Sequence, residues 1–298
     1  MKKLHILTAL CLISALLLSC VFTASADNAA PVAENQEIST YRGVSVSGQL
    51  AAMDPEGEAV TFQITTPPIK GTLELAEDGC FVYTPADGKR GRDYFGYKAT
   101  DASGAVSHEA TVIIRIEKQK GKVTYSDMAG NGAAYAAVRL AEEEIFVGEC
   151  LGGKYVFAPE AEVSRGEFLA MCMKLAGTEV LSGVQRTGFT DDRDIPQWLR
   201  PYVSTALLCG AVTGEYGERG ATFSPARAIT GAEAASMLNN VLGLNDVRYV
   251  SADDAVPRWA AQAVMNLSAS RILASGTPVR ETLTRADAAV MLLRAMEK

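Results

Sequence analysis

Two arginines stand where an α-helix could bind an anion. Arg165 and Arg285 each follow a hydroxyl residue that suits a helix N-cap, so each guanidinium would lie at the first helical position. Free backbone amides and the helix dipole favour a negative charge there, and a guanidinium adds paired hydrogen bonds to a carboxylate. Trp198 and Trp259 would either pack against a sugar face or be buried in a core. These residue types point to binding of an anionic saccharide.

Catalytic chemistry has little support in the sequence. Beyond residue 26 the only histidine is His108, and neither a metal-ligand cluster nor a nucleophile elbow is evident. The acid pairs Asp191-Asp192 and Asp253-Asp254 would have to face one another across a cleft to hydrolyse a glycoside. They look instead like loop and helix-start acids. We therefore expect no enzymatic activity and no cofactor.

Composition places the chain among globular proteins. Its 298 residues are 48% hydrophobic and 21% charged, which is enough for two or more domains. The net charge of -7 argues against nucleic acid or an anionic membrane surface as the main partner, because both require a basic field. Any anionic ligand must therefore be met by a local site.

Residues 1–26 are predicted to be a signal peptide. Two lysines precede an apolar run over residues 4–18, and the small-residue site Ala24-Ser25-Ala26 follows. In a second interpretation a lipoprotein processing site would lipidate Cys20. We favour cleavage after Ala26, because its site is the cleaner one. We expect an exported protein at the cell wall or cell surface, with no membrane span in the mature chain.

Residues 27–117 have the pattern of a β-sandwich. Apolar and polar residues alternate, which is typical of half-buried strands, and turn sequences such as Asp78-Gly79 separate the runs. About ninety residues of this kind make a small sandwich. A charged linker over residues 118–122 ends the pattern. The alternating apolar positions include Val60, Phe62, Ile64, Phe81, Tyr83, Phe95, Tyr97, Val112, Ile114 and Ile116.

This region resembles bacterial immunoglobulin-like or cadherin-like modules. The resemblance rests on Asp54-Pro55-Glu56-Gly57, on Thr66-Pro67-Pro68, and on Phe81-Val82-Tyr83-Thr84-Pro85. Such modules serve as spacers or adhesive units in surface proteins, and some bind calcium through acidic loops. The calcium candidates are Asp54, Glu56 and Asp101, because that ion prefers oxygen ligands; carboxylates in turns otherwise form the turn itself.

From residue 123 a helical pattern repeats at roughly sixty residues. The predicted units are 123–181, 182–244 and 245–298. Each has an aromatic residue near an acidic loop, a helix, a glycine-containing turn and a second helix. Two short helices are too little to bury their own apolar face, so the units should pack on one another. We expect an all-α bundle after the all-β sandwich.

Capping boxes mark the start of each second helix. Ser164 and Thr230 are each followed three residues later by Glu, and Thr284 is followed by Asp287. In such a box the hydroxyl accepts a hydrogen bond from the third amide, while the acid reaches back to the cap. The second helices should therefore begin at these residues.

The repeats resemble the S-layer homology domain. That family's pattern joins Trp-Ala, a glycine turn, Phe-x-Pro and an Ile-Thr-Arg-Ala-Glu box; this chain has Trp259-Ala260, Phe223-Ser224-Pro225 and Leu283-Thr284-Arg285-Ala286. The resemblance implies a pseudo-threefold bundle of three repeats, whose grooves bind an anionic secondary cell-wall polysaccharide that is often pyruvylated. We expect the ligand to be bound by Arg165, Arg285, Trp198, Trp259, Asp127 and Asp191.

The repeats depart from the family pattern at two positions. Gly231 stands where an arginine is expected, and Gly132 stands near the tryptophan position of the first unit. The groove that relies on Gly231 should bind weakly or not at all. The expected protein is held non-covalently on the wall by its repeats. Alternatively, the immunoglobulin-like module is an adhesin or receptor for an external ligand that the sequence does not identify, and the repeats only anchor it.

Overall fold

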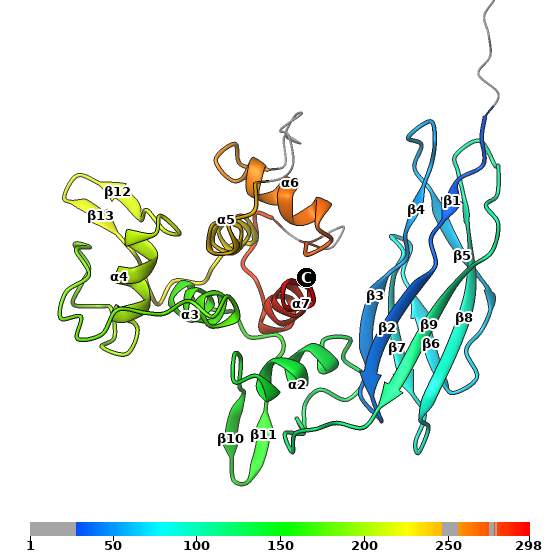
Figure 1. Cartoon of the computed structure of the whole chain (residues 1–298), viewed down its shortest axis with the longest axis horizontal. Helices are drawn as coiled ribbons and strands as arrows, with labels where there is room; N and C mark the ends of the chain where they lie inside the picture. Colours follow the sequence, from blue (N-terminus) through cyan, green and yellow to red (C-terminus); the bar gives the residue numbers. More distant parts are fainter. Residues whose placement is uncertain (1–27, 246–255, 274–276, 278) are drawn as a thin grey trace, which may run out of the picture.

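The computed structural model describes residues 28–245, 256–273, 277 and 279–298. The predicted signal peptide 1–26, with Cys20, and the acid pair Asp253-Asp254 lie outside the described residues. A β-sandwich and a helical region lie side by side (Figure 1).

The N-terminal region is a β-sandwich, which confirms the predicted all-β class. One sheet has the strand order β2 (Gln36–Tyr41), β9 (Ala110–Glu117), β8 (Gly91–Thr100) and β5 (Thr61–Thr66). The other has the order β3 (Val46–Gln49), β7 (Cys80–Pro85) and β6 (Gly71–Leu75). A short pair joins β1 (Val32–Ala33) to β4 (Ala52–Met53). Strand β2 runs parallel to β9, and the other neighbours are antiparallel.

The sandwich core consists of alternate residues along each strand. Val112, Ile114 and Ile116 of β9 are buried, while the residues between them are more exposed. Phe81 and Phe95 come from the two facing sheets and meet edge to face, with ring centroids 5.2 Å apart. Removing these side chains from water stabilises the sandwich in proportion to the buried apolar area.

The described C-terminal residues form three pairs of helices. Unit one has α2 (Ala134–Glu142) and α3 (Arg165–Leu175), unit two has α4 (Arg200–Leu208) and α5 (Gly231–Leu242), and unit three has α6 (Ala261–Ala269) and α7 (Arg285–Met296). The capping boxes at Ser164, Thr230 and Thr284 are confirmed in all three second helices. Figure 1 shows α3, α5 and α7 at the centre of the region. None of the described helices has the length and apolar character to cross a membrane.

A ring of backbone hydrogen bonds joins the three units. The amide of Val163 donates to Leu283 (3.1 Å), Leu283 donates to Ile229 (2.9 Å), and Ile229 donates back to Val163 (2.9 Å). All three side chains are buried. The units therefore have a pseudo-threefold arrangement. A second set of backbone hydrogen bonds joins the units in the same order at the helix starts. The amide of Arg165 donates to the carbonyl of Arg227, that of Gly231 to Glu281, and that of Arg285 to Ala161.

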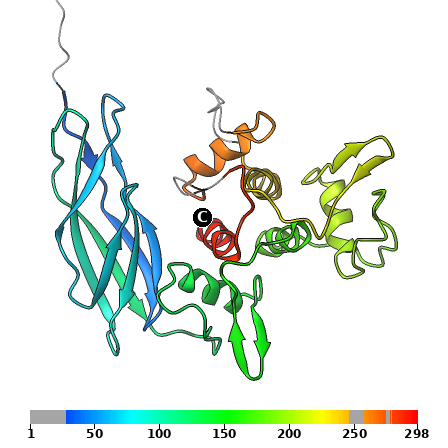
Figure 2. The ribbon, with the colours of Figure 1, turned by 180° about the vertical axis from the view of Figure 1, so that it is seen from behind.

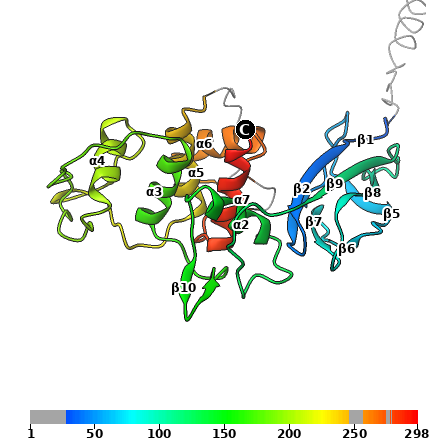
Figure 3. The same cartoon turned by 60° about the horizontal axis from the view of Figure 1, so that its bottom comes forward.

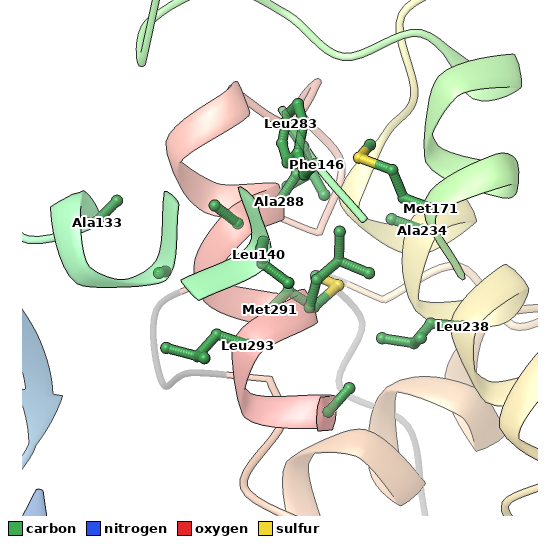
Figure 4. Close-up of a cluster of buried hydrophobic side chains, with 14 of the residues drawn as sticks. Ala133, Leu140, Phe146, Met171, Ala234, Leu238, Leu283, Ala288, Met291 and Leu293 are labelled. Carbon is green, nitrogen blue, oxygen red and sulfur yellow. The ribbon is translucent and has the colours of Figure 1, made fainter. Parts of the chain in front are cut away.

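Apolar side chains from the units share one core. Leu140 of α2, Met171 of α3, Leu238 of α5 and Met291 of α7 belong to the same buried cluster (Figure 4). Each of them is at most 5% exposed. No unit could bury these residues alone, as expected for a short repeat.

The C-terminal region is not all-α as predicted. A hairpin separates the two helices in unit one, β10 (Glu149–Leu151) with β11 (Lys154–Val156), and in unit two, β12 (Glu215–Gly217) with β13 (Gly220–Thr222). The first hairpin has a local cause, because Gly152 and Gly153 have φ of 57° and 81°. Its two-residue turn requires positive φ at both positions. The second hairpin lies at the end of the helical region away from the sandwich (Figure 2).

The sandwich packs directly on α2. The amide of Ser47 donates to the carbonyl of Gly132 (2.8 Å), and the Tyr41 hydroxyl donates to the Glu142 carboxylate (2.7 Å). The rings of Tyr41 and Tyr135 meet edge to face at 5.1 Å. Glu142 also accepts hydrogen bonds from two backbone amides of the predicted linker. Figure 3 shows α2 and α7 on the side of the helical region that faces the sandwich.

Gly132 permits this contact, so a tryptophan there should disrupt it. A Cβ at Gly132 would lie 3.0 Å from Val82 Cγ2 and 3.1 Å from Ser47 Cβ. Gly132→Trp should lower the free energy of unfolding by about 1–3 kcal/mol through overpacking, measured by urea unfolding. Ala129→Trp adds the same side chain at an exposed loop position and should change it by less than about 0.5 kcal/mol. Equal losses in both variants would contradict this account of the interface.

Candidate functional site between the helical units

A cavity that we call the first groove lies between the three units. It is lined by Phe146 from the turn after α2, Glu167 and Lys174 from α3, Trp198 before α4, and Arg285 at the start of α7. Its volume is about 220 Å³. Each of the three units contributes to it.

A second groove repeats the first by the pseudo-threefold relation. It is lined by Val212 from the turn after α4, Glu233 and Asn240 from α5, Trp259 before α6, and Arg165 at the start of α3. Its volume is about 620 Å³. The two grooves thus have the same plan, but they differ in size and in side chains.

The turn after each first helix is built alike. The amides of Ile145 and Phe146 both donate to the carbonyl of Leu140, at 2.9 and 3.3 Å. Residues 211–212 and 272–273 repeat this arrangement in the other units. This tight reversal brings the turn residue Phe146 into the first groove.

Each arginine lies at the start of its helix, as predicted, and a Phe-x-Pro segment holds it. Arg285 Nε donates to the carbonyl of Phe157 (2.6 Å). Its guanidinium lies 4.5 Å from the ring centroid of Phe146 and 5.0 Å from that of Phe157. Arg165 Nε likewise donates to the carbonyl of Phe223 (3.0 Å). Both guanidinium groups are therefore held in one orientation.

The predicted ligand residues Asp127 and Asp191 hold these Phe-x-Pro segments. Asp127 accepts hydrogen bonds from the backbone amides of Phe157 and Ala158 at 2.7 to 3.1 Å. Asp191 accepts the equivalent hydrogen bonds from the backbone amides of residues 223–224. Partial burial raises the pKa of Asp127, but the backbone hydrogen bonds and the nearby arginine outweigh it and hold that pKa below its usual value. These carboxylates thus fix the backbone of the Phe-x-Pro segments. Their contact with a ligand stays a prediction.

The two arginines differ in their acidic partners. Arg165 is 6% exposed, and its Nη1 lies 2.8 Å from the carboxylate of Glu233, whose side chain is 13% exposed. Arg227 pairs with the same carboxylate. Arg285 is half-buried and forms no ion pair within 4.0 Å with any residue that the structure describes. Arg165 is therefore paired directly with a carboxylate, whereas the carboxylate of Asp127 acts on Arg285 only from beyond ion-pair distance among the described residues.

Both tryptophans are exposed, so the core interpretation of these residues is wrong. Trp198 is 55% and Trp259 is 63% exposed. Each stands two residues before its helix begins and lines its groove. An exposed indole beside a cavity offers a flat apolar face and one N–H donor.

The third equivalent place has neither an arginine nor a tryptophan. The same relation brings Gly231 to the arginine position and Gly132 to the tryptophan position of one groove. Here Ser47 and Val82 of the sandwich share a cavity with Arg294 of α7. The pseudo-threefold relation thus assigns both departures to the same groove, and Ser47 and Val82 of the sandwich lie beside Gly132 there.

The calcium candidates are used in hydrogen bonds within the sandwich. Asp54 accepts the amides of Glu56 and Glu58, at 3.0 and 2.8 Å, and Asp101 accepts the side-chain amide of Asn28 (2.9 Å). Across the residues that the structure describes, no three His, Cys, Asp or Glu side chains are grouped so that they could hold a metal ion. Calcium binding by Asp54, Glu56 and Asp101 stays a prediction.

Sequence reasoning missed three groove residues. Phe146, Lys174 and the ion-pair partner Glu233 line the grooves, but the sequence marks Glu233 only as a capping acid. Aligning the units at their capping boxes identifies equivalent positions. It does not show which unit supplies the arginine to which groove.

Comparison with known proteins identifies the N-terminal region. Residues 28–118 match the family of bacterial cadherin-like domains, so the sandwich is a bacterial cadherin-like domain. No curated protein matches the chain.

Similar solved structures cover about a third of the chain. They include an endo-fucoidan hydrolase of glycoside hydrolase family 107 (18% identity, 33% of this chain, 15% of that chain, TM-score 0.26). A point mutant of the SrpA adhesin from Streptococcus sanguinis also matches (22% identity, 34% of this chain, 62% of that chain, TM-score 0.25). Fibronectin(III)-like modules of Clostridium thermocellum CbhA match as well (15% identity, 32% of this chain, 51% of that chain, TM-score 0.23). The match spans 14% to 18% of the first four solved chains. TM-scores this low carry no argument about function.

Removing the buried arginine should cost more stability than removing the half-buried one. Arg165→Ala leaves the partly buried Glu233 with one cation fewer, and the expected loss is about 3 kcal/mol, reduced in part by Arg227. Arg285→Ala loses one hydrogen bond and an aromatic contact, about 1 kcal/mol. Urea unfolding of both variants measures the difference. Equal losses would contradict the structural role of the Arg165 ion pair.

The stability should depend on pH through Glu233. Burial raises the pKa of Glu233, but hydrogen bonds from Arg227 and Thr230 and the charge of Arg165 outweigh it and hold the pKa below 4.5. Because the folded pKa is the lower one, this carboxylate contributes fully above pH 4.5, and the contribution is lost as the pH falls through the folded pKa. Glu233→Gln should flatten the fall of unfolding free energy in this range. If the free energy of unfolding fell equally with pH in the wild-type and Glu233→Gln proteins, Glu233 would be excluded as the source of the pH dependence.

Proposed function

We propose that this protein is exported and held non-covalently on the cell wall by its three helical units. In this proposal the first groove binds a wall polysaccharide that carries carboxylate groups, and the cadherin-like domain is displayed outside. The observation that carries the proposal is a half-buried Arg285 that forms no ion pair with any described residue, in the same cavity as the exposed Trp198.

Arg285 is prepared to bind a carboxylate. Its Nε donates to the carbonyl of Phe157, and its guanidinium carbon lies 4.5 Å from the ring centroid of Phe146, so the remaining N–H donors are held in a fixed fork. Lys174 adds a second cation to the cavity, and Trp198 offers an apolar face to a sugar ring. A sugar that carries a carboxylate satisfies both groups.

The repeat pattern supports the same function. The three units carry capping boxes, and units one and two carry Phe-x-Pro segments, so they resemble S-layer homology repeats. The resemblance implies binding of secondary cell-wall polysaccharide in grooves between repeats. A pyruvyl group on such a polymer supplies the carboxylate that the chemistry of Arg285 favours.

The cadherin-like domain would be displayed in a fixed position. Its contacts with α2 through Tyr41 and Ser47 join it to the region that holds the wall. The alternative, an adhesin whose cadherin-like domain binds an external ligand, uses the same anchor and differs only in what that domain does.

Co-sedimentation of the mature protein with cell-wall sacculi tests the proposal. Arg285→Ala should weaken binding at least about tenfold, because it removes a charge-assisted, two-pronged contact. Arg193→Ala removes the same charge at an exposed position that lines neither groove, and it should bind like wild type. Chemical removal of the secondary polysaccharide should abolish binding. Binding that survives that treatment, or that is unchanged in Arg285→Ala, would contradict the proposal.

A further inference from the structure

The two open grooves differ in charge. The lining of the first groove has two cations, Arg285 and Lys174, and one carboxylate, Glu167. The lining of the second has one cation, Arg165, and two carboxylates, Glu215 and Glu233. Counting only residues that the structure describes, the first groove has one positive charge in excess, and the second has one negative charge in excess.

Charges beside the grooves do not remove this contrast. Arg227 pairs with both Glu215 and Glu233, which brings the second groove only to neutrality. Asp127 and Asp191 hold equivalent positions in their units, so they affect both grooves alike. With these neighbours included, the described charges sum to zero around the first groove and to one negative charge around the second, so an anionic ligand is favoured in the first groove over the second.

The second groove is instead rich in uncharged polar groups. Asn240, Gln262 and Ser236 line it together with Trp259. The Ser236 hydroxyl is buried and has no hydrogen-bond partner among the described residues. Amides and hydroxyls beside an aromatic face suit the hydroxyl groups of a neutral sugar. The volume of about 620 Å³, against about 220 Å³ in the first groove, leaves room for a complete sugar unit.

We infer that the two grooves bind different parts of one polysaccharide, the first a carboxylate-bearing sugar and the second a neutral sugar. This inference rests on the proposed function and deepens it. The ion pair between Arg165 and Glu233 sets the difference, because it occupies a guanidinium that would otherwise bind a carboxylate. The equivalent acid of the first groove, Glu167, forms no ion pair with Arg285. A polymer engaged at both grooves gains avidity from the second contact.

The two tryptophans allow each groove to be measured separately. Trp198 and Trp259 are the only tryptophans of the chain. The fluorescence of Trp259→Phe reports the first groove, and that of Trp198→Phe reports the second. The probes are N-acetylmuramic acid and its neutral carboxamide, which differ in charge at one group. The first groove should bind the acid at least about tenfold more tightly than the amide, and the second should bind both within about threefold.

Releasing Arg165 should give the second groove the preference of the first. Glu233→Gln in the Trp198→Phe protein should raise its affinity for the acid about tenfold. Asp287→Asn changes the equivalent capping acid, which lines the cavity beside the sandwich. In the same Trp198→Phe protein it is the matched control that should leave the second groove unchanged. If Glu233→Gln proves too unstable to titrate, the comparison of the two grooves with native Glu233 decides the question.

The outcomes distinguish the division of labour between the two grooves from the anchor function. The same acid preference in both grooves, or no gain in a folded Glu233→Gln protein, would overturn the division between grooves and leave the anchor function standing. No fluorescence response of either tryptophan to either sugar, nor to polysaccharide released from sacculi, would overturn the anchor function itself.

Discussion

The closed ring of hydrogen bonds among Val163, Ile229 and Leu283 is the constraint on which the helical region depends. Each amide of the ring needs a carbonyl from a different unit, so no unit can complete its own backbone pairing. A buried amide without a partner costs about 1–3 kcal/mol, which favours folding of all three units together. The ring also sets where the second helices begin, and hence where Arg165 and Arg285 lie.

A cyclic arrangement builds three grooves from one sequence pattern and lets each change separately. In the first groove Arg285 forms no ion pair with a described residue, and in the second Arg165 is paired with Glu233. The third groove has Gly231 and Gly132 in place of the arginine and the tryptophan, and residues of the cadherin-like domain line the cavity there. The fold thus supplies equivalent positions, and single residues decide what each position can bind.

The scaffold was largely predictable because its signals are local. Strand alternation over residues 27–117 and the capping boxes are decided within a few residues. The pair Arg165 and Glu233 was not predictable, since the two residues are 68 positions apart and meet only through the cyclic order of the units. The hairpin at Gly152-Gly153 had a local signal, but the helical period of the flanking segments outweighed it. The exposure of Trp198 likewise depends on packing between units.

Hydrogen-exchange mass spectrometry of the mature protein, with and without polysaccharide released from sacculi, tests the central claim most directly. The account predicts slower exchange in residues 144–148 and 198–203, which border the first groove, and unchanged exchange in strands β5 and β8 of the cadherin-like domain. Slower exchange confined to the cadherin-like domain, or no change anywhere, would contradict a wall anchor that works through the helical units.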